Sequence, residues 1–158
     1  MTLKKLTTLA VLAIMVCATA LTGIVAMAQQ VQQPATSATV SMSDIDNALA
    51  NGPVFVEFET PGCHYCQQQR PISQQLQSSY TGKVTFFFVD ATQNHDLANT
   101  FQITMVPQID IIVSKSGSTY TYEGPSGKSN SISSSRFIGL TQSDQLKSAI
   151  DAALKDRT

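Results

Sequence analysis

Hydrophobic residues are unevenly distributed along this chain, and a long apolar run at its start differs from the remainder of the sequence. Lys4 and Lys5 precede an uncharged run of about twenty-three residues, which closes with the small-x-small sequence at 26–28. This pattern predicts that residues 1–28 are a signal peptide, or an N-terminal membrane anchor if the run, long enough to span a bilayer, is not cleaved. Residues 29–42, rich in Gln, Ala, Thr and Ser without apolar periodicity, predict a flexible linker.

From residue 43 onward, short apolar runs alternate with stretches of helical periodicity. The short runs predict strands at 53–58, 84–89, 108–113 and 119–123, and a short strand end at 137–139. Helical spacing and capping residues predict helices from Ser41 or Ser43 to about 50, over 63–80, over 96–101, and from Thr141 or Ser143 onward. Residues 125–135, rich in Ser, Gly and Asn, predict a surface loop. This order predicts one α/β domain over 43–158, in which helices flank a central mixed β-sheet.

The composition limits the partners that the domain is expected to bind. Of the 158 residues, 42% are hydrophobic, enough for a core, but only 13% are charged, against about 25% in ordinary domains. A net charge of -1 and a pI near 6.0 give no electrostatic basis for binding nucleic acid or an anionic membrane surface. A single small domain without a dimerisation segment argues against a dedicated isomerase, and we expect a monomer.

Cys63 and Cys66 are the candidate reactive residues, because the remaining cysteine, Cys17, lies in the apolar leader. Two thiols separated by two residues can form a disulfide within one helical turn. The leader predicts an extracytoplasmic location (periplasm, cell surface or secreted, with the apolar segment as an optional tether), where disulfides persist. Cys63 opens the predicted helix at 63–80, where free backbone N–H groups and the helix dipole favour a thiolate. We therefore expect Cys63 to be the nucleophile and Cys66, one turn deeper, the resolving thiol.

Several residues in register with this pair match a known family. Glu57 lies six residues before Cys63, where that family has a buried acid, and Pro71 lies five residues after Cys66, where its helix is kinked. From about residue 43 to the C-terminus the chain resembles thioredoxin and its exported relatives. The resemblance implies a thioredoxin-like fold and a thiol-disulfide oxidoreductase that exchanges disulfides with protein substrates. It implies no cofactor beyond the redox-active disulfide of Cys63 and Cys66.

The resemblance also implies roles for residues outside the cysteine motif. Burial of Glu57 in an apolar strand would raise the pKa of its carboxyl, which suits a proton acceptor for Cys66; the alternative is a strand-edge glutamate that points to water. Val106-Pro107 stands where the family has its cis-proline. A cis bond there would expose the Val106 backbone for strand-like pairing with an extended substrate, whereas a trans proline would only start an edge strand.

His64 and Tyr65, between the cysteines, depart from the Gly-Pro that is usual in thioredoxin. We assign both to the substrate-binding surface together with Val106 and Pro107. His64 can favour the Cys63 thiolate and make the pair a better oxidant; its alternative is a solvent-exposed ring without a partner. The residues leave open whether the domain oxidises, reduces or isomerises its substrates. We expect a membrane redox partner to recharge the dithiol.

A metal-binding function is the alternative from another class. Cys63, His64 and Cys66 could hold copper or zinc, as in a thioredoxin-fold module or metallochaperone. A closed zinc site needs four ligands, however, and His95 is the one other histidine. We therefore predict no metal site. Gln67 follows Cys66 where a haem-attachment motif would require histidine.

Overall fold

The computed structural model describes residues 39–157 of the chain. The predicted leader and residues 29–38 of the predicted linker lie outside the described residues. Order begins before residue 43, because the Val40 N–H donates to Asn94 Oδ1 at 2.9 Å and Ser41 caps the first described helix. Between residues 39 and 157, no helix is both long and apolar enough to cross a membrane.

A mixed six-stranded sheet forms the centre of the domain. Its strands are β1 (Val54–Glu59), β2 (Thr85–Asp90), β3 (Gln108–Ser116), β4 (Thr119–Gly124), β5 (Gly127–Ser129) and β6 (Phe137–Ile138). The order is β2-β1-β3-β4-β5, with β6 paired to the start of β3. β1 is parallel to β2 and antiparallel to β3, so the sheet is mixed, as the sequence predicts.

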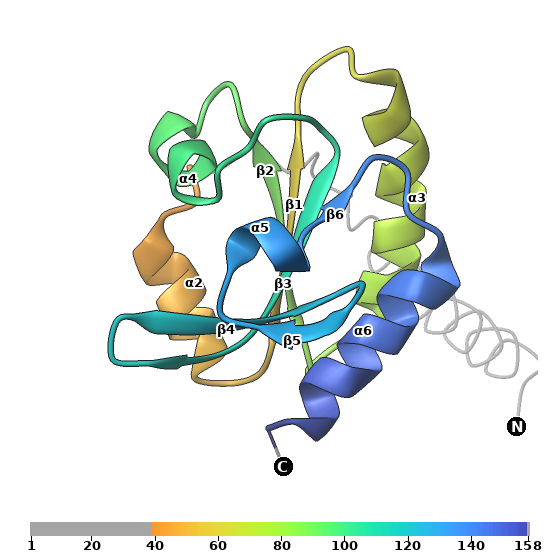
Figure 1. The fold of residues 1–158 in the computed structure, drawn as a ribbon. Helices are drawn as coiled ribbons and strands as arrows, with labels where there is room; N and C mark the ends of the chain where they lie inside the picture. Colours follow the sequence, from red (N-terminus) through yellow and green to blue (C-terminus); the bar gives the residue numbers. More distant parts are fainter. Residues whose placement is uncertain (1–38, 158) are drawn as a thin grey trace, which may run out of the picture. The chain divides into compact units, whose positions relative to one another are not determined.

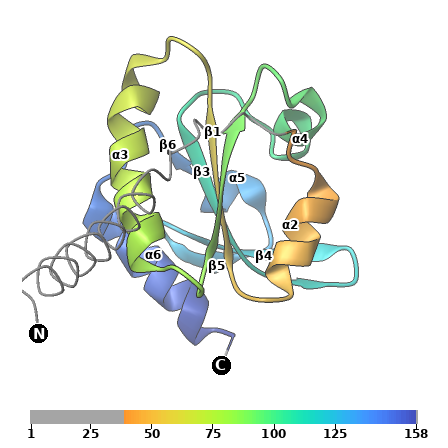
Figure 2. The same cartoon turned by 180° about the vertical axis from the view of Figure 1, so that it is seen from behind.

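Helices cover both faces of this sheet. They are α2 (Met42–Leu49), α3 (His64–Ser79), α4 (His95–Thr100), α5 (Ile132–Ser135) and α6 (Ser143–Lys155). α3 and α6 lie against one face, and α2 and α4 lie against the other (Figures 1 and 2). The predicted α/β fold with helices flanking a central mixed sheet is confirmed.

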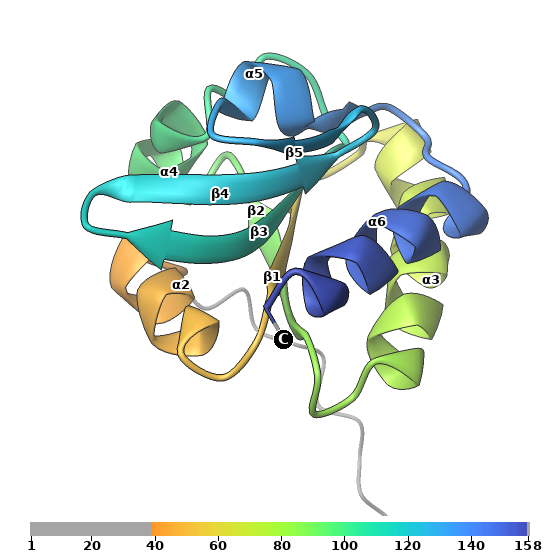
Figure 3. The ribbon, with the colours of Figure 1, turned by 60° about the horizontal axis from the view of Figure 1, so that its bottom comes forward.

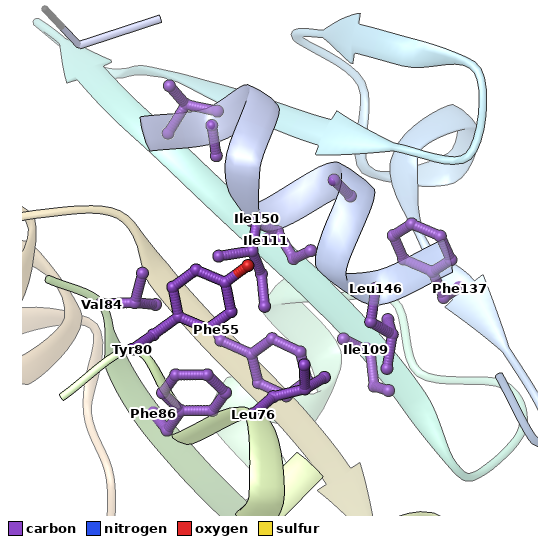
Figure 4. Packing of buried hydrophobic residues seen from close by; sticks show 13 residues of the cluster. Phe55, Leu76, Tyr80, Val84, Phe86, Ile109, Ile111, Phe137, Leu146 and Ile150 are labelled. Atoms are coloured by element: carbon purple, nitrogen blue, oxygen red, sulfur yellow. The ribbon is translucent and has the colours of Figure 1, made fainter. Parts of the chain in front are cut away.

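The alternation of side chains along β1 divides the core into two apolar clusters. Phe55 points toward α3 and α6, where it stacks on Phe86 with the ring centroids 4.6 Å apart (Figure 4). Val54, Val56 and Phe58 point the opposite way, toward α2 and α4. Because both faces are buried, the strand is apolar at every position except Glu57 and its last residue, Glu59.

The predicted surface loop at 125–135 contains two short elements instead. β5 pairs with β4, and α5 lies beside this hairpin (Figure 3). Ile132 packs against the apolar cluster on the α2 side, and the Ser135 hydroxyl donates to the Ser131 carbonyl at 2.7 Å. Contacts with β4 and with this cluster, together with local hydrogen bonds, therefore accompany regular structure in a stretch whose own sequence lacks periodicity.

The last helix begins with a different residue from those predicted. Gln142, rather than Thr141 or Ser143, occupies the N-cap position of α6, and its side chain forms no capping hydrogen bond. Thr141 is engaged elsewhere, because its hydroxyl donates to the Gly139 carbonyl at 3.2 Å and its N–H to Gln69 Oε1 at 2.8 Å.

Candidate active site

Three connections meet at one end of the sheet (Figure 1). β1 ends there and leads through the cysteine motif into α3. The register pairs Phe58, near the end of β1, with Gln108, the first residue of β3, and pairs Gln108 in turn with Ile138 of β6. The antiparallel pairing therefore brings residues 60–63, 101–107 and 139–142 to the same end of the sheet, although they are far apart in the sequence.

Cys63 and Cys66 form a disulfide at the N-terminus of α3, with their Cα atoms 5.2 Å apart. Cys63 is the N-cap residue, and its Sγ accepts a hydrogen bond from the Cys66 N–H at 3.1 Å. Cys63 is half-buried, whereas Cys66 is 3% exposed. The residue expected to attack is therefore the more accessible of the two, and the residue expected to resolve lies beneath it.

Val106 and Pro107 lie directly beside the disulfide. The Val106–Pro107 peptide bond is cis, and the Val106 carbonyl oxygen is 3.8 Å from Cys63 Sγ. The Pro107 carbonyl accepts a hydrogen bond from the Gly139 N–H at 2.8 Å. This segment is therefore fixed between the cysteine motif on one side and the β6–α6 connection on the other.

Exposed apolar side chains come from each of the segments that meet at the disulfide. Among residues 39–157, three large hydrophobic side chains are exposed: Tyr65 at 58%, Met105 at 60% and Ile138 at 43%. Tyr65 comes from the cysteine motif, Met105 from the residues before Val106, and Ile138 from β6. The sequence analysis found the first of these but missed Met105 and Ile138, whose nearness to Cys63 follows only from the strand register.

The His64 side chain is exposed and contacts residues of its own helix, α3. Its Nε2 lies 2.7 Å from the side-chain nitrogen of Gln68, with which it hydrogen-bonds, and its ring meets Tyr65 edge-on. Within the described part of the chain, no hydrogen bond joins His64 to Cys63. The ring is therefore solvent-exposed, as the alternative has it, but it is not without a partner, because it bonds Gln68.

Glu57 is buried on the face of the sheet that α3 covers. Its side chain is 0% exposed, and neither carboxylate oxygen has a hydrogen-bond partner. Burial raises the pKa of the Glu57 carboxyl, while the nearby Ser73 hydroxyl and the Arg70 guanidinium offset part of that rise. The alternative of a strand-edge glutamate facing water is therefore wrong.

Known proteins resemble this chain in sequence as well as in the layout of the site. The family model named Thioredoxin matches residues 36–151, which is more than half of the chain. The chain belongs to the thioredoxin family. It is 29% identical over 86 residues to chloroplastic thioredoxin M4 of Arabidopsis thaliana, covering 50% of this chain and 45% of that protein. It is 36% identical over 64 residues to protein disulfide isomerase-like 2-3 of Oryza sativa subsp. japonica, covering 40% of this chain and 14% of that protein. The matches therefore span less than half the length of these relatives.

Solved structures of the family share the fold. The crystal structure of chloroplastic thioredoxin z superposes with a TM-score of 0.54 at 21% identity, covering 72% of this chain and 90% of that one. Oxidised mitochondrial thioredoxin 3 of Saccharomyces cerevisiae gives a TM-score of 0.51 at 19% identity, covering 70% and 88%. At these identities the likeness concerns the arrangement of strands and helices.

An ion pair that could not be predicted from the sequence lies next to the Cys63–Cys66 disulfide. Arg70, from α3, pairs with Glu59 at the end of β1, and its guanidinium carbon lies 4.1 Å from the centroid of the Phe88 ring. Arg70 and Glu59 both line a cavity of about 480 Å³ that also contains Cys63 and Cys66. Charged and apolar groups therefore meet on the exposed side of the disulfide.

The buried face of α3 carries two polar residues that the sequence analysis also missed. Gln69 and Ser73 follow Cys66 on the buried face of the helix, and both are 0% exposed. Gln69 accepts from the Thr141 N–H at 2.8 Å and donates to Ser73 at 3.4 Å. Their spacing of three and seven residues from Cys66 is the signal that could have identified them.

The residues proposed for the metal alternative do not gather into a ligand set. Within residues 39–157, no group of three or more Cys, His, Asp or Glu side chains is placed to hold a metal ion. His95 is the first residue of α4 and lines a separate cavity beside α2. It therefore supplies no further ligand to Cys63, His64 and Cys66.

Proposed function

We propose that this domain is a thiol-disulfide oxidoreductase that exchanges disulfides with protein substrates through Cys63 and Cys66. The observation that carries the proposal is the order of the site from the surface inward. An accessible Cys63 caps α3, Cys66 lies buried behind it, and Glu57, whose burial favours the uncharged carboxyl, lies on the face of the sheet that α3 covers. The names of the relatives, thioredoxins and protein disulfide isomerases, are consistent with this chemistry.

In the reducing direction, the Cys63 thiolate attacks one sulfur of a substrate disulfide. A mixed disulfide forms, and the other substrate sulfur leaves as a thiolate. Cys66 then loses its proton and attacks Cys63 Sγ, which forms the internal disulfide and releases the substrate as a dithiol. Two electrons pass from the domain to the substrate; the same steps in reverse oxidise a substrate dithiol.

The protein environment supports each of these steps. The N-terminus of α3 and the Cys66 N–H, which already donates to Cys63 Sγ, would stabilise negative charge on Cys63. The Glu57 carboxyl, whose pKa is raised by burial, is suited to take the proton from Cys66. We assign Glu57 this role, with the proton passing directly or through one bridging water.

The substrate is proposed to be an extended polypeptide lying along Val106. The backbone of Val106, a half-buried residue next to Cys63, would pair with the substrate main chain, as an added strand does. Tyr65, Met105 and Ile138 would then contact apolar side chains on either side of the substrate cysteine. Pro107 holds the segment in place, and His64 lines the outer edge of this surface.

The cellular setting belongs to the proposal as well. The signal-like sequence at 1–28 supports work outside the cytoplasm, where a membrane redox partner would recharge the dithiol. We propose a monomer, because the described domain completes its own site. Measuring the reduction potential of the Cys63–Cys66 couple distinguishes the directions: about -270 mV indicates a reductant, and about -120 mV indicates an oxidant.

A trapping experiment tests the proposal itself. Cys66→Ala should accumulate mixed disulfides with protein substrates, because nothing resolves them, and Cys63→Ala should abolish both trapping and insulin-disulfide reduction. Ser78→Ala, on the exposed side of α3, is the matched control and should behave as the wild type. Full activity in the Cys63→Ala variant would contradict the proposed nucleophile.

A further inference from the structure

A buried polar pair lies immediately behind the Val106–Pro107 segment, on the face of the sheet opposite Glu57. Gln108 and Asp110 are the first and third residues of β3, and both side chains are 0% exposed. They alternate with Ile109 and Ile111, which face α3 and α6, so they point toward α2 and α4. An amide and a carboxyl therefore lie within an otherwise apolar cluster.

The Gln108 side chain closes the loop that carries the substrate-binding segment. Its amide nitrogen donates to the Phe101 carbonyl at 3.2 Å and to Asp110 Oδ2 at 2.9 Å. Phe101 and Gln108 are the two ends of the connection between α4 and β3, and this connection contains Met105, Val106 and Pro107. The position of the segment therefore depends on the orientation of one buried amide.

Two atoms of this pair have no partner, and one proton would join them. Gln108 Oε1 and Asp110 Oδ1 are both buried without a hydrogen bond. A carboxylic acid and a primary amide can form two parallel hydrogen bonds, one N–H···O and one O–H···O. A proton on Asp110 would complete this arrangement, whereas a carboxylate would leave two buried acceptors unsatisfied.

Burial of Asp110 favours its protonated form. Burial raises the pKa of Asp110 to about 7, although the Gln108 amide and the charge of Arg136 act in the opposite direction. Arg136, which follows α5, donates to the Gln102 carbonyl at 2.9 Å rather than to Asp110. From β4 the titratable neighbour is Tyr122, and no titratable group of α2 or α4 is among the causes that shift the pKa of Asp110.

We propose that Gln108 and Asp110 form a proton-dependent acid-amide pair that positions the Val106–Pro107 segment for its substrate. The proposal rests on the proposed function, since that function makes this segment the binding site. With the proton present, the pair holds the orientation of the Gln108 amide and therefore the base of the loop. Without it, Gln108 Oε1 and Asp110 Oδ1 remain two buried acceptors without a partner, and this cost weakens the hold of the pair on the base of the loop. Gln108 and Asp110 are thus positioning residues that make substrate binding depend on pH.

Asp110→Asn is the decisive variant, because it replaces the removable proton with a permanent N–H donor of nearly the same shape. The matched control is Glu123→Gln, on the neighbouring strand β4. Glu123 is also buried with a raised pKa, but it pairs with Ile111 and lines a cavity against α6, away from the disulfide. The measurements are KM and kcat for insulin-disulfide reduction across the range from about pH 6 to about pH 8.5, where Asp110 would lose its proton.

We expect the KM of the wild type to change with pH in a way that the KM of Asp110→Asn does not. Between these two pH values the ratio of wild-type KM to Asp110→Asn KM should rise by about threefold to tenfold, while the kcat ratio stays flat. Taking the ratio cancels the titration of Cys63, which both proteins share. Glu123→Gln should follow the wild type. Parallel KM curves for the wild type and Asp110→Asn would overturn the proposal.

A measurement without substrate separates this inference from the proposed function. Amide hydrogen exchange at Met105, Val106 and Gln108, corrected for its intrinsic pH dependence, should become faster in the wild type on going to about pH 8.5 and remain unchanged in Asp110→Asn. Equal protection in both proteins at both pH values would refute the pair as a positioning device, whatever the activity. If the wild type shows this exchange behaviour but no reaction with protein disulfides, the proposed function fails and the pair stands. Should Asp110→Asn prove too unstable to assay, constant wild-type protection is enough to reject the inference.

Discussion

Arg70 and Glu59 form a two-point ion pair one helical turn beyond Cys66, on the rim of the cavity that contains the disulfide. Glu59 lies two residues after Glu57 in β1, so both carboxyl groups lie on the side of the sheet that α3 covers. The positive charge of Arg70 lowers the pKa of Glu57 against the larger effect of burial. The ion pair therefore sets part of the electrostatic environment of the proposed proton acceptor.

Substitutions in this ion pair should shift the pH dependence of exchange in opposite directions. Arg70→Gln removes the neighbouring positive charge and should raise the pKa of Glu57 further, whereas Glu59→Gln leaves Arg70 unneutralised and should lower it. The measurement is the pH profile of the rate at which Cys66 resolves a mixed disulfide, followed by rapid quench and mass spectrometry. Lys128→Gln, in a surface ion pair on β5, is the control. Shifts of the same sign in both variants would argue against this coupling.

Glu57 itself should matter for rate rather than for folding. Glu57→Gln keeps the size of the side chain but cannot accept a proton, so the resolving step at neutral pH should slow by about tenfold or more. The attack of Cys63 on the substrate should change little. Single-turnover kinetics separate the two steps, with Glu123→Gln as a control for loss of a buried strand carboxyl. An unchanged resolving rate would remove Glu57 from the mechanism.

The parts of the site that depend on local sequence could be predicted. Cys63 follows a strand and opens a helix, so its place at the N-terminus of α3 is contained in a few consecutive residues. The burial of Glu57 follows in the same way from its place inside an apolar run. Asp110 stands in a similar run, Ile109 to Val113, and the same argument would have identified it.

The contacts between segments could not be predicted in this way. The pairing of Arg70 with Glu59, and of the Gln108 amide with the Phe101 carbonyl, depends on how α3 and α4 pack on the sheet. Such partners leave no periodic signal in the chain. β5 and α5 were missed for another reason: elements of three and four residues are shorter than the window in which apolar periodicity can be recognised.

The packing of α5 on the sheet gives a stability prediction for the 125–135 segment. A Cβ atom at Gly124 would lie 2.4 Å from the Ser135 Cα, so the backbone of α5 would have to shift. Gly124→Ala should therefore lower the free energy of unfolding by about 1–3 kcal/mol, measured by denaturant titration. Ser133→Ala, on the exposed side of α5, should stay within about 0.5 kcal/mol of the wild type. A Gly124→Ala variant as stable as the wild type would mean that α5 is not packed as described.

Asp110 should make the domain less stable as the pH rises toward neutrality. The pKa of Asp110 is raised from 3.8 to about 7 on folding. At pH values between these two, the folded state therefore binds more protons than the unfolded state. The free energy of unfolding should therefore fall as the pH rises through the interval, by up to about 4 kcal/mol, and level off above it. Asp110→Asn lacks this group and should lose that part of the fall.

Glu57, whose pKa is also raised, contributes a fall of the same sign, so the double variant with Glu57→Gln should have the flattest profile. The measurement is denaturant unfolding of the oxidised protein at a series of pH values, and an Asp110→Asn profile parallel to that of the wild type would show that Asp110 is charged in the folded domain.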